Sequence, residues 1–313
     1  MGTPDFAVPS LEALAASDHA VVGVLSQPDR PRGRGRKLAP TPIHAAAECL
    51  GLPLLQPDKV GSADAVAWMR AREPDLGCVV AFGQYIGRVV RELPPRGLIN
   101  AHASLLPRWR GAAPIQHAIL AGDTRTGVTI IRVAREMDAG DADGRVETPI
   151  GPDETAGELA LRLSQLAAQL LVGAVDAIAA DRARFEPQPR EGVTLAPRVD
   201  RDFGRIDWSR PRDEVLRRVR AATPAPGAWT ELWPGPRGIR LLRARQALAE
   251  PGEAASRPAR PGAVSTAGGR LRIAAVDGWI EVHRLQEMGR REQGAGSWLR
   301  GARLLRDEEI EAR

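Results

Sequence analysis

The chain has 313 residues, 43% of them hydrophobic, and a formal net charge of +5. This length is enough for two domains with buried cores, and it excludes a single small module. We expect a cytoplasmic protein that does not associate with a membrane, because no apolar run approaches 18 residues and no charged and then apolar leader opens the chain.

The charge is distributed unevenly. Residues 1–204 carry 23 basic and 25 acidic side chains, whereas residues 205–313 carry 21 and 14, which gives net charges of −2 and +7. The excess of positive charge favours a polyanionic partner for the C-terminal part. Codon bias is the alternative explanation, since only two of the 44 basic residues are lysine.

Strand-like and helix-like segments alternate through the first half of the chain. After a helix near residues 4–17, the sequence predicts strands at 20–26, 76–82, 98–101 and 127–133, with helices at 41–50, 63–73 and 114–121. This alternation is typical of a parallel α/β sheet, in which ligands bind at the carboxyl ends of the strands. A long amphipathic helix is predicted at about 154–183.

The second half has a different pattern. Residues 186–204 are rich in proline and charge without periodicity, which predicts a linker. A helical segment at 206–219 then precedes short alternating stretches broken by glycine and proline, as in a small β-barrel. The expected organisation is an α/β domain at 1–185, a linker at 186–204 and a C-terminal domain at 205–313.

The stretch from Gly97 to Pro114 has the composition of a reactive site. It begins as an apolar strand, and Asn100, His102 and Ser104 then recur at every second residue, so an extended backbone places them on one face. An amide that can donate to an oxyanion, beside an imidazole that can move a proton, suits acyl or one-carbon transfer. A histidine merely hydrogen-bonded at a strand end is the structural alternative.

Two classes of cofactor have little support. The segment from Gly2 to Pro4 forms no phosphate cradle, because proline lacks the amide donor that a pyrophosphate would need. The five histidines and two cysteines show no metal-ligand spacing. We therefore expect neither a nicotinamide or flavin nor a metal.

The sequence NAHASLLPRWRGAAP at 100–114 resembles the signature of the folate-dependent formyltransferases. The resemblance covers nearly the whole chain and includes GTPDFA at 2–7, QPDRPRGRGRKL at 27–38, AFG at 81–83, MDAGD at 137–141, RIDWS at 205–209 and WLRGARL at 298–304. It implies a Rossmann-like parallel-sheet formyltransferase domain followed by an OB-like barrel. The implied activity is transfer of the formyl group of 10-formyltetrahydrofolate to the α-amino group of methionyl initiator tRNA, by a monomer without a metal.

The resemblance also implies roles for individual residues. Asn100 would hold the formyl oxygen, His102 would take a proton from the attacking amine, and Asp141 would orient the protonated imidazole. Asp138 is the nearby rival of Asp141 in the same loop. The residues that would contact folate are Ser104, Leu105, Leu106, Pro107, Phe82 and Gly83.

A run of basic residues precedes the second predicted helix. By itself such a run is usually a hydrated loop, but in relatives the matching segment enters the tRNA acceptor stem. The resemblance therefore implies tRNA binding by Arg30, Arg32, Arg34, Arg36 and Lys37. Candidates for contacts to the RNA backbone in the C-terminal part are Arg217, Arg218, Arg220, Arg240, Arg243 and Arg245.

Two other functions and one uncertainty about the fold remain open. A formyltransferase of this fold could instead act on glycinamide ribonucleotide or an amino-sugar nucleotide, and a non-enzymatic nucleic-acid-binding protein is the second alternative. Relatives carry an apolar strand directly before GTPDF. We therefore expect the central first strand to be missing from this sequence, through a late start codon or a truncation.

Overall fold

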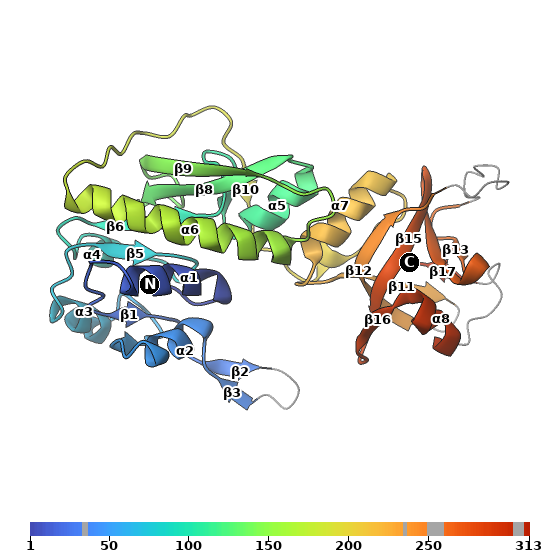
Figure 1. The fold of residues 1–313 in the computed structure, drawn as a ribbon, viewed down its shortest axis with the longest axis horizontal. Helices are drawn as coiled ribbons and strands as arrows, with labels where there is room; N and C mark the ends of the chain where they lie inside the picture. The colour runs from blue at the N-terminus through green and yellow to red at the C-terminus, as the bar shows by residue number, and fades with distance from the viewer. Residues whose placement is uncertain (33–36, 234–236, 249–259, 303–309) are drawn as a thin grey trace. The chain divides into compact units, whose positions relative to one another are not determined.

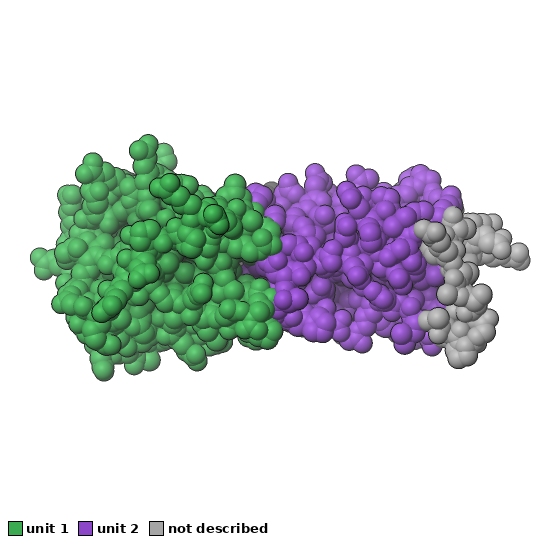
Figure 2. Space-filling view, turned by 90° about the horizontal axis from the view of Figure 1, so that it is seen from above, with its two compact units in different colours: residues 1–114, 125–149, 160–196 green, residues 115–124, 150–159, 197–313 purple. Residues whose placement is uncertain are grey.

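The computed structural model describes residues 1–32, 37–233, 237–248, 260–302 and 310–313. The chain divides into two compact units (Figure 2). Unit 1 contains residues 1–114, 125–149 and 160–196, and unit 2 contains residues 115–124, 150–159 and 197–313.

A four-stranded sheet forms the centre of unit 1. Its order is β5 (Gly77–Val79), β6 (Leu98–His102), β8 (Arg125–Arg132) and β9 (Ala142–Pro149). β5 and β6 are parallel, as predicted. The expectation that the strand near 127–133 also runs parallel is wrong. β8 is antiparallel because the chain re-enters the sheet at the carboxyl end of β6, where Thr129 pairs with His102.

A second pair of parallel strands, β1 (Val24–Leu25) and β4 (Leu54–Leu55), belongs to the same unit. Met1 and Gly2 connect it to the central sheet, since Gly2 donates to the Leu25 carbonyl at 3.0 Å and Val80 donates to the Met1 carbonyl at 2.9 Å. A largely apolar cavity of about 530 Å³ lies beside this junction. Burial there raises the pKa of the Cys78 thiol to about 11, so the thiol is uncharged at neutral pH.

Four helices of unit 1, α1, α2, α3 and α6, lie close to positions that the sequence predicted, whereas the short helix α4 was not predicted (Figure 1). Thr41 and Ser62 begin two of them, each accepting a hydrogen bond from a backbone N–H of the first turn. The long helix α6 is apolar enough to cross a membrane by length and composition, but Leu163 and Leu171 on it are fully buried, as in a core helix. The elements are η1 (Asp5–Ala7), α1 (Val8–Ala15), α2 (Pro42–Cys49), α3 (Ala63–Arg70), α4 (Arg88–Arg91) and α6 (Ala156–Ala179).

Unit 2 contains a seven-stranded antiparallel sheet that almost closes into a barrel. A bridge between Ala263 and Glu311 joins its two edges. This confirms the predicted barrel. The strands are β11 (Ala228–Trp233), β12 (Arg237–Gln246), β13 (Val264–Ser265), β14 (Leu271–Ala275), β15 (Gly278–Glu287), β16 (Glu292–Gly294) and β17 (Glu311–Ala312).

The barrel strands share one apolar core with two helices of unit 2, α7 and α8. Val215 and Val219 on α7 and Trp298 on α8 are buried against the strands. Trp208 is also buried, and its indole N–H donates to Thr230 Oγ1 at 3.0 Å, so the polar atom of the ring is satisfied. The remaining elements of the unit are α5 (Pro114–Ala121), η2 (Asp202–Gly204), α7 (Arg212–Ala222), η3 (Ala267–Gly269) and α8 (Ala295–Ala302).

Candidate active site

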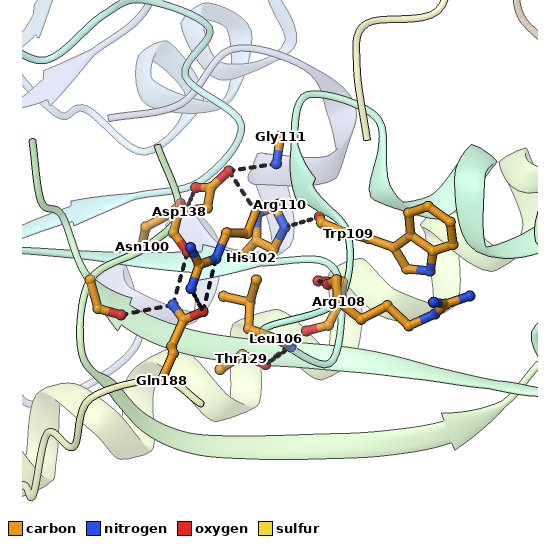
Figure 3. A network of polar contacts seen from close by, with 12 residues as sticks. Asn100, His102, Leu106, Arg108, Trp109, Arg110, Gly111, Thr129, Asp138 and Gln188 are labelled. Carbon is orange, nitrogen blue, oxygen red and sulfur yellow. Dashed lines mark hydrogen bonds and ion pairs between the residues drawn. The ribbon is translucent and has the colours of Figure 1, made fainter. Parts of the chain in front are cut away.

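The site lies at the carboxyl end of β6. Asn100 and His102 are two residues apart on this strand, so they project from the same face of the sheet. His102 Nδ1 lies 3.6 Å from Asp138 Oδ2, and Asn100 Nδ2 donates to Asp138 Oδ1 at 3.4 Å. The His102 and Asp138 side chains are only 6% and 15% exposed. Figure 3 shows the three side chains pointing toward one another.

The carboxylate that faces this pair is Asp138 and not Asp141. Asp141 is exposed, and its backbone carbonyl accepts a hydrogen bond from the Arg132 N–H at 2.8 Å. The structure therefore brings together two members of the predicted trio with the rival aspartate. Sequence alone could not separate the two aspartates, because they lie three residues apart in one loop between β8 and β9.

A backbone donor also holds Asp138. The Gly111 N–H donates to Asp138 Oδ2 at 2.9 Å. Only glycine fits at this position, because φ is +125° and a Cβ would lie 2.6 Å from the Ala196 carbonyl oxygen. The close approach arises because β7 (Arg110–Gly111) pairs in parallel with β10 (Leu195–Ala196). Part of the segment predicted as a linker thus packs against the site.

One hydrogen bond of His102 assigns its tautomer. Its Nε2 lies 2.8 Å from the carbonyl oxygen of Trp109, and since a carbonyl only accepts, Nε2 carries the hydrogen in this assignment. Nδ1 is then the nitrogen that can accept a proton, and it faces Asp138. Trp109 itself has φ of 64°, a left-handed conformation that is uncommon for a residue other than glycine.

Hydrogen bonds from Thr129 on β8 hold the backbone of the SLLP tetrapeptide at 104–107. Thr129 Oγ1 donates to the Ser104 carbonyl at 2.7 Å and accepts from the Leu106 N–H at 3.2 Å. Ser104 and Leu106 are buried, whereas Leu105 and Pro107 are half-buried. Two of the four predicted folate contacts within this tetrapeptide, Ser104 and Leu106, therefore have side chains that are buried in the loop's own packing.

The turn after β5 lies at the same edge of the sheet as His102. The Phe82 carbonyl accepts hydrogen bonds from Thr3 Oγ1 at 2.9 Å and from Gln27 Nε2 at 3.1 Å, and the Phe82 side chain is buried. Gly83 has φ of +78°, and a Cβ there would lie 2.4 Å from the Gln27 amide nitrogen. The predicted Phe82–Gly83 element is thus a rigid turn that requires glycine.

The predicted basic loop contains a hairpin that projects from unit 1 (Figure 1). Its strands are β2 (Arg30–Arg32) and β3 (Lys37–Ala39), and they pair in an antiparallel register. Arg30 is exposed on the first strand. Arg34 and Arg36 lie outside the described residues.

One carboxylate holds the base of this hairpin. Asp29 accepts hydrogen bonds from the Thr41 N–H at 3.0 Å and from Gln56 Nε2 at 2.7 Å, and its Oδ2 lies 2.8 Å from His44 Nδ1. Burial acts to raise the pKa of the Asp29 carboxyl, but these hydrogen bonds outweigh it and the pKa lies below its ordinary value. Asp29 is therefore ionised at neutral pH. Its bond to Thr41 connects the residue before β2 with the segment after β3.

Most of the C-terminal arginines suggested as RNA contacts are engaged inside unit 2. Arg217, Arg218, Arg220 and Arg243 donate to backbone carbonyls of that unit. Arg240 is exposed on β12. These bonds reduce the number of guanidinium donors left for RNA, so Arg240 is the stronger candidate among them.

Comparison with protein families gives matches over most of the chain. Residues 1–175 match the formyl transferase family, and residues 198–303 match the formyl transferase C-terminal domain. The methionyl-tRNA formyltransferase of Halorhodospira halophila is 45% identical over 311 residues, covering 99% of this chain and 97% of the relative. That of Acidothermus cellulolyticus is 43% identical, covering 97% of this chain and 96% of the relative.

Solved structures share the fold. The N-formyltransferase of Helicobacter canadensis, in complex with folinic acid and dTDP-3-aminofucose, has a TM-score of 0.64 at 15% identity and covers 91% of this chain and 97% of its own. HypX of Aquifex aeolicus, in complex with tetrahydrofolic acid, has a TM-score of 0.58 at 19% identity and covers 82% of this chain and 43% of its own. At such identities the likeness concerns the fold alone.

Proposed function

This chain belongs to the methionyl-tRNA formyltransferase family, and we propose that it transfers its formyl group at the cluster of Asn100, His102 and Asp138. The convergence of these three side chains at one edge of the sheet carries the assignment. The proposed donor is 10-formyltetrahydrofolate, and the proposed acceptor is the α-amino group of methionyl initiator tRNA.

The first step forms the new carbon–nitrogen bond. The lone pair of the uncharged α-amine attacks the formyl carbon, and the electrons of the carbonyl double bond move to its oxygen. Asn100 has two amide hydrogens, of which one faces Asp138, so the other can donate to this oxyanion. Such a donor stabilises the intermediate by roughly 3 kcal/mol when it is preorganised.

The protons then move through His102. The ammonium of the tetrahedral intermediate loses a proton to Nδ1, and the Asp138 carboxylate stabilises the resulting imidazolium. The oxyanion then re-forms the carbonyl double bond, the bond from the formyl carbon to N10 of the folate breaks with its electron pair going to N10, and N10 takes the proton back from His102. The products are formylmethionyl-tRNA and tetrahydrofolate, without a covalent enzyme intermediate.

The donor would lie between two fixed elements at this edge of the sheet. An aromatic pterin needs a flat apolar surface and backbone hydrogen bonds. The half-buried Leu105 and Pro107 would offer the surface, and backbone groups of the Phe82–Gly83 turn would offer hydrogen bonds beside the Phe82 carbonyl, which already accepts from Thr3 and Gln27. The buried Ser104 and Leu106 support the loop from behind.

We further propose that unit 1 carries the chemistry and that unit 2 contacts the tRNA. The excess of positive charge in residues 205–313 supports the second assignment. The hairpin strands β2 and β3 would contact the acceptor end of the tRNA, and the exposed Arg30 lies on the first of them. The proposed enzyme is a cytoplasmic monomer that does not associate with a membrane.

Reversing charge on the hairpin tests its role. In the double variant Arg30→Glu and Arg32→Glu, KM for methionyl-tRNA is expected to rise by about tenfold or more at low salt, because two phosphate contacts become repulsive. The slope of log KM against log salt should become shallower by about one to two units. Steady-state formylation at a series of salt concentrations measures both values. An unchanged KM and slope would remove the hairpin from the tRNA interface.

The choice of acceptor distinguishes this function from its rivals. Purified protein and labelled 10-formyltetrahydrofolate are incubated separately with methionyl-tRNA, glycinamide ribonucleotide and an amino-sugar nucleotide. We expect label in methionyl-tRNA alone. Transfer to either small amine in preference to the tRNA would contradict the proposal, as would binding of tRNA without any transfer.

A further inference from the structure

A fourth side chain, Gln188, joins the segments that surround the catalytic cluster. Its Nε2 donates to the carbonyl oxygens of Asp138 and Gly140, both at 2.8 Å. Its Oε1 accepts from Arg110 Nε at 3.1 Å and from Arg110 Nη2 at 2.8 Å. Figure 3 shows this amide next to the Asp138 loop, on a segment that the sequence predicted to be a linker.

These contacts act on both sides of the Asp138 carboxylate. Gln188 holds the backbone carbonyl of Asp138 itself, and through Arg110 it is bonded to β7, where the adjacent Gly111 donates to the carboxylate. The Arg110 side chain is only 13% exposed, so this bond is shielded from water. The bond from Gln188 thus holds the main chain of Asp138, and the bond from Gly111, whose neighbour Arg110 is bound to Gln188, holds its side chain.

The local backbone requires such support. Asp138 has φ of 51°, a left-handed conformation that costs free energy for a residue other than glycine. A conformation of this kind persists only where the surrounding contacts fix it. The side-chain amide of Gln188 donates twice to this loop, and its two acceptors, the carbonyls of Asp138 and Gly140, are two residues apart.

We propose that Gln188 is a positioning residue for formyl transfer. It fixes the loop at Asp138–Gly140 so that the carboxylate stays beside His102 Nδ1 during the proton transfer. This inference rests on the proposed function of Asp138. Gln188 does not touch the reacting atoms, so its loss should change the rate of the chemical step and leave substrate binding intact.

Two variants separate this role from simple packing. Gln188→Ala removes all the contacts. Gln188→Glu keeps an acceptor for Arg110 but places carboxylate oxygens against two carbonyls. We expect both variants to lower kcat by about 10- to 100-fold and to leave KM for each substrate within about twofold. If Gln188→Glu keeps the full kcat, the bond to Arg110 is what matters and the proposed action on the loop is overturned.

A matched control and a reference variant complete the test. Arg96 also joins distant segments of unit 1 by donating to the Ile178 carbonyl at 2.7 Å, but it lies outside the network around Asp138. Arg96→Ala is expected to lower Tm without lowering kcat, whereas the Gln188 variants lower kcat in the folded enzyme. If both Gln188 variants keep a normal kcat while Asp138→Asn lowers it, the positioning role of Gln188 is overturned and the proposed role of Asp138 stands. Normal kcat in Asp138→Asn would instead overturn the proposed function of Asp138.

Discussion

Replacing His102 with alanine is expected to lower kcat for methionyl-tRNA formylation by about 10²- to 10⁴-fold, the usual contribution of a general acid–base residue. Without the imidazole, the attacking amine must lose its proton to water, and N10 of the folate must gain one from water. KM for both substrates should change little, because the ring acts on protons of the transition state. Steady-state kinetics at saturating 10-formyltetrahydrofolate measure the effect.

The chain offers a matched control for this variant. His117 also bonds a backbone carbonyl through Nε2, at 3.1 Å from the Pro197 oxygen, but it belongs to unit 2. His117→Ala should therefore retain kcat, and thermal unfolding of both variants reports any loss of folded enzyme. Undiminished formylation by a folded His102→Ala variant would discard the catalytic role of this residue.

The two aspartates of the MDAGD loop should respond very differently to removal of their charge. Asp138→Asn is expected to lower kcat by about 100-fold or more, because the imidazolium loses its partner while the side chain keeps its size. The new amide oxygen can still accept from Gly111, so the loop should stay folded. Asp141→Asn should stay within about twofold of the parent kcat, since its carboxylate is exposed.

Rapid-quench measurement of single-turnover transfer would compare these two variants without interference from product release. The opposite pattern of rates would contradict the assignment of Asp138. If Asp141→Asn were impaired and Asp138→Asn were normal, the assignment implied by the family resemblance would stand, and the contacts of Asp138 would be structural only.

Much of the fold could be predicted because the local spacing of apolar residues indicates where its helices and strands lie. The period of the apolar residues predicted β6 and α5 within one or two residues, and the short alternating stretches predicted the barrel. The direction of β8 could not be predicted in this way. A buried strand has the same apolar composition in a parallel and an antiparallel pair, so only the path of the chain between β6 and β8 decides it.

The arrangement of the candidate site could be predicted where its residues lie on one strand. The spacing of Asn100 and His102 predicts a shared face, because strand geometry fixes it. The choice of Asp138 over Asp141 depends on a left-handed backbone turn, and the contacts of Gln188 depend on how residues 186–196 return to β7. Such long-range contacts leave no periodic signal, and proline and charge in that segment indicated a linker.

A double-mutant cycle between His102 and Asp138 tests most directly whether the cluster acts as one unit. The single-turnover rate is measured for the parent, for His102→Ala, for Asp138→Asn and for the double variant. If the carboxylate works through the imidazole, the double variant should be about as slow as His102→Ala alone. A rate reduced by the full product of the two single effects would show that the two side chains act independently, and it would contradict the proposed mechanism.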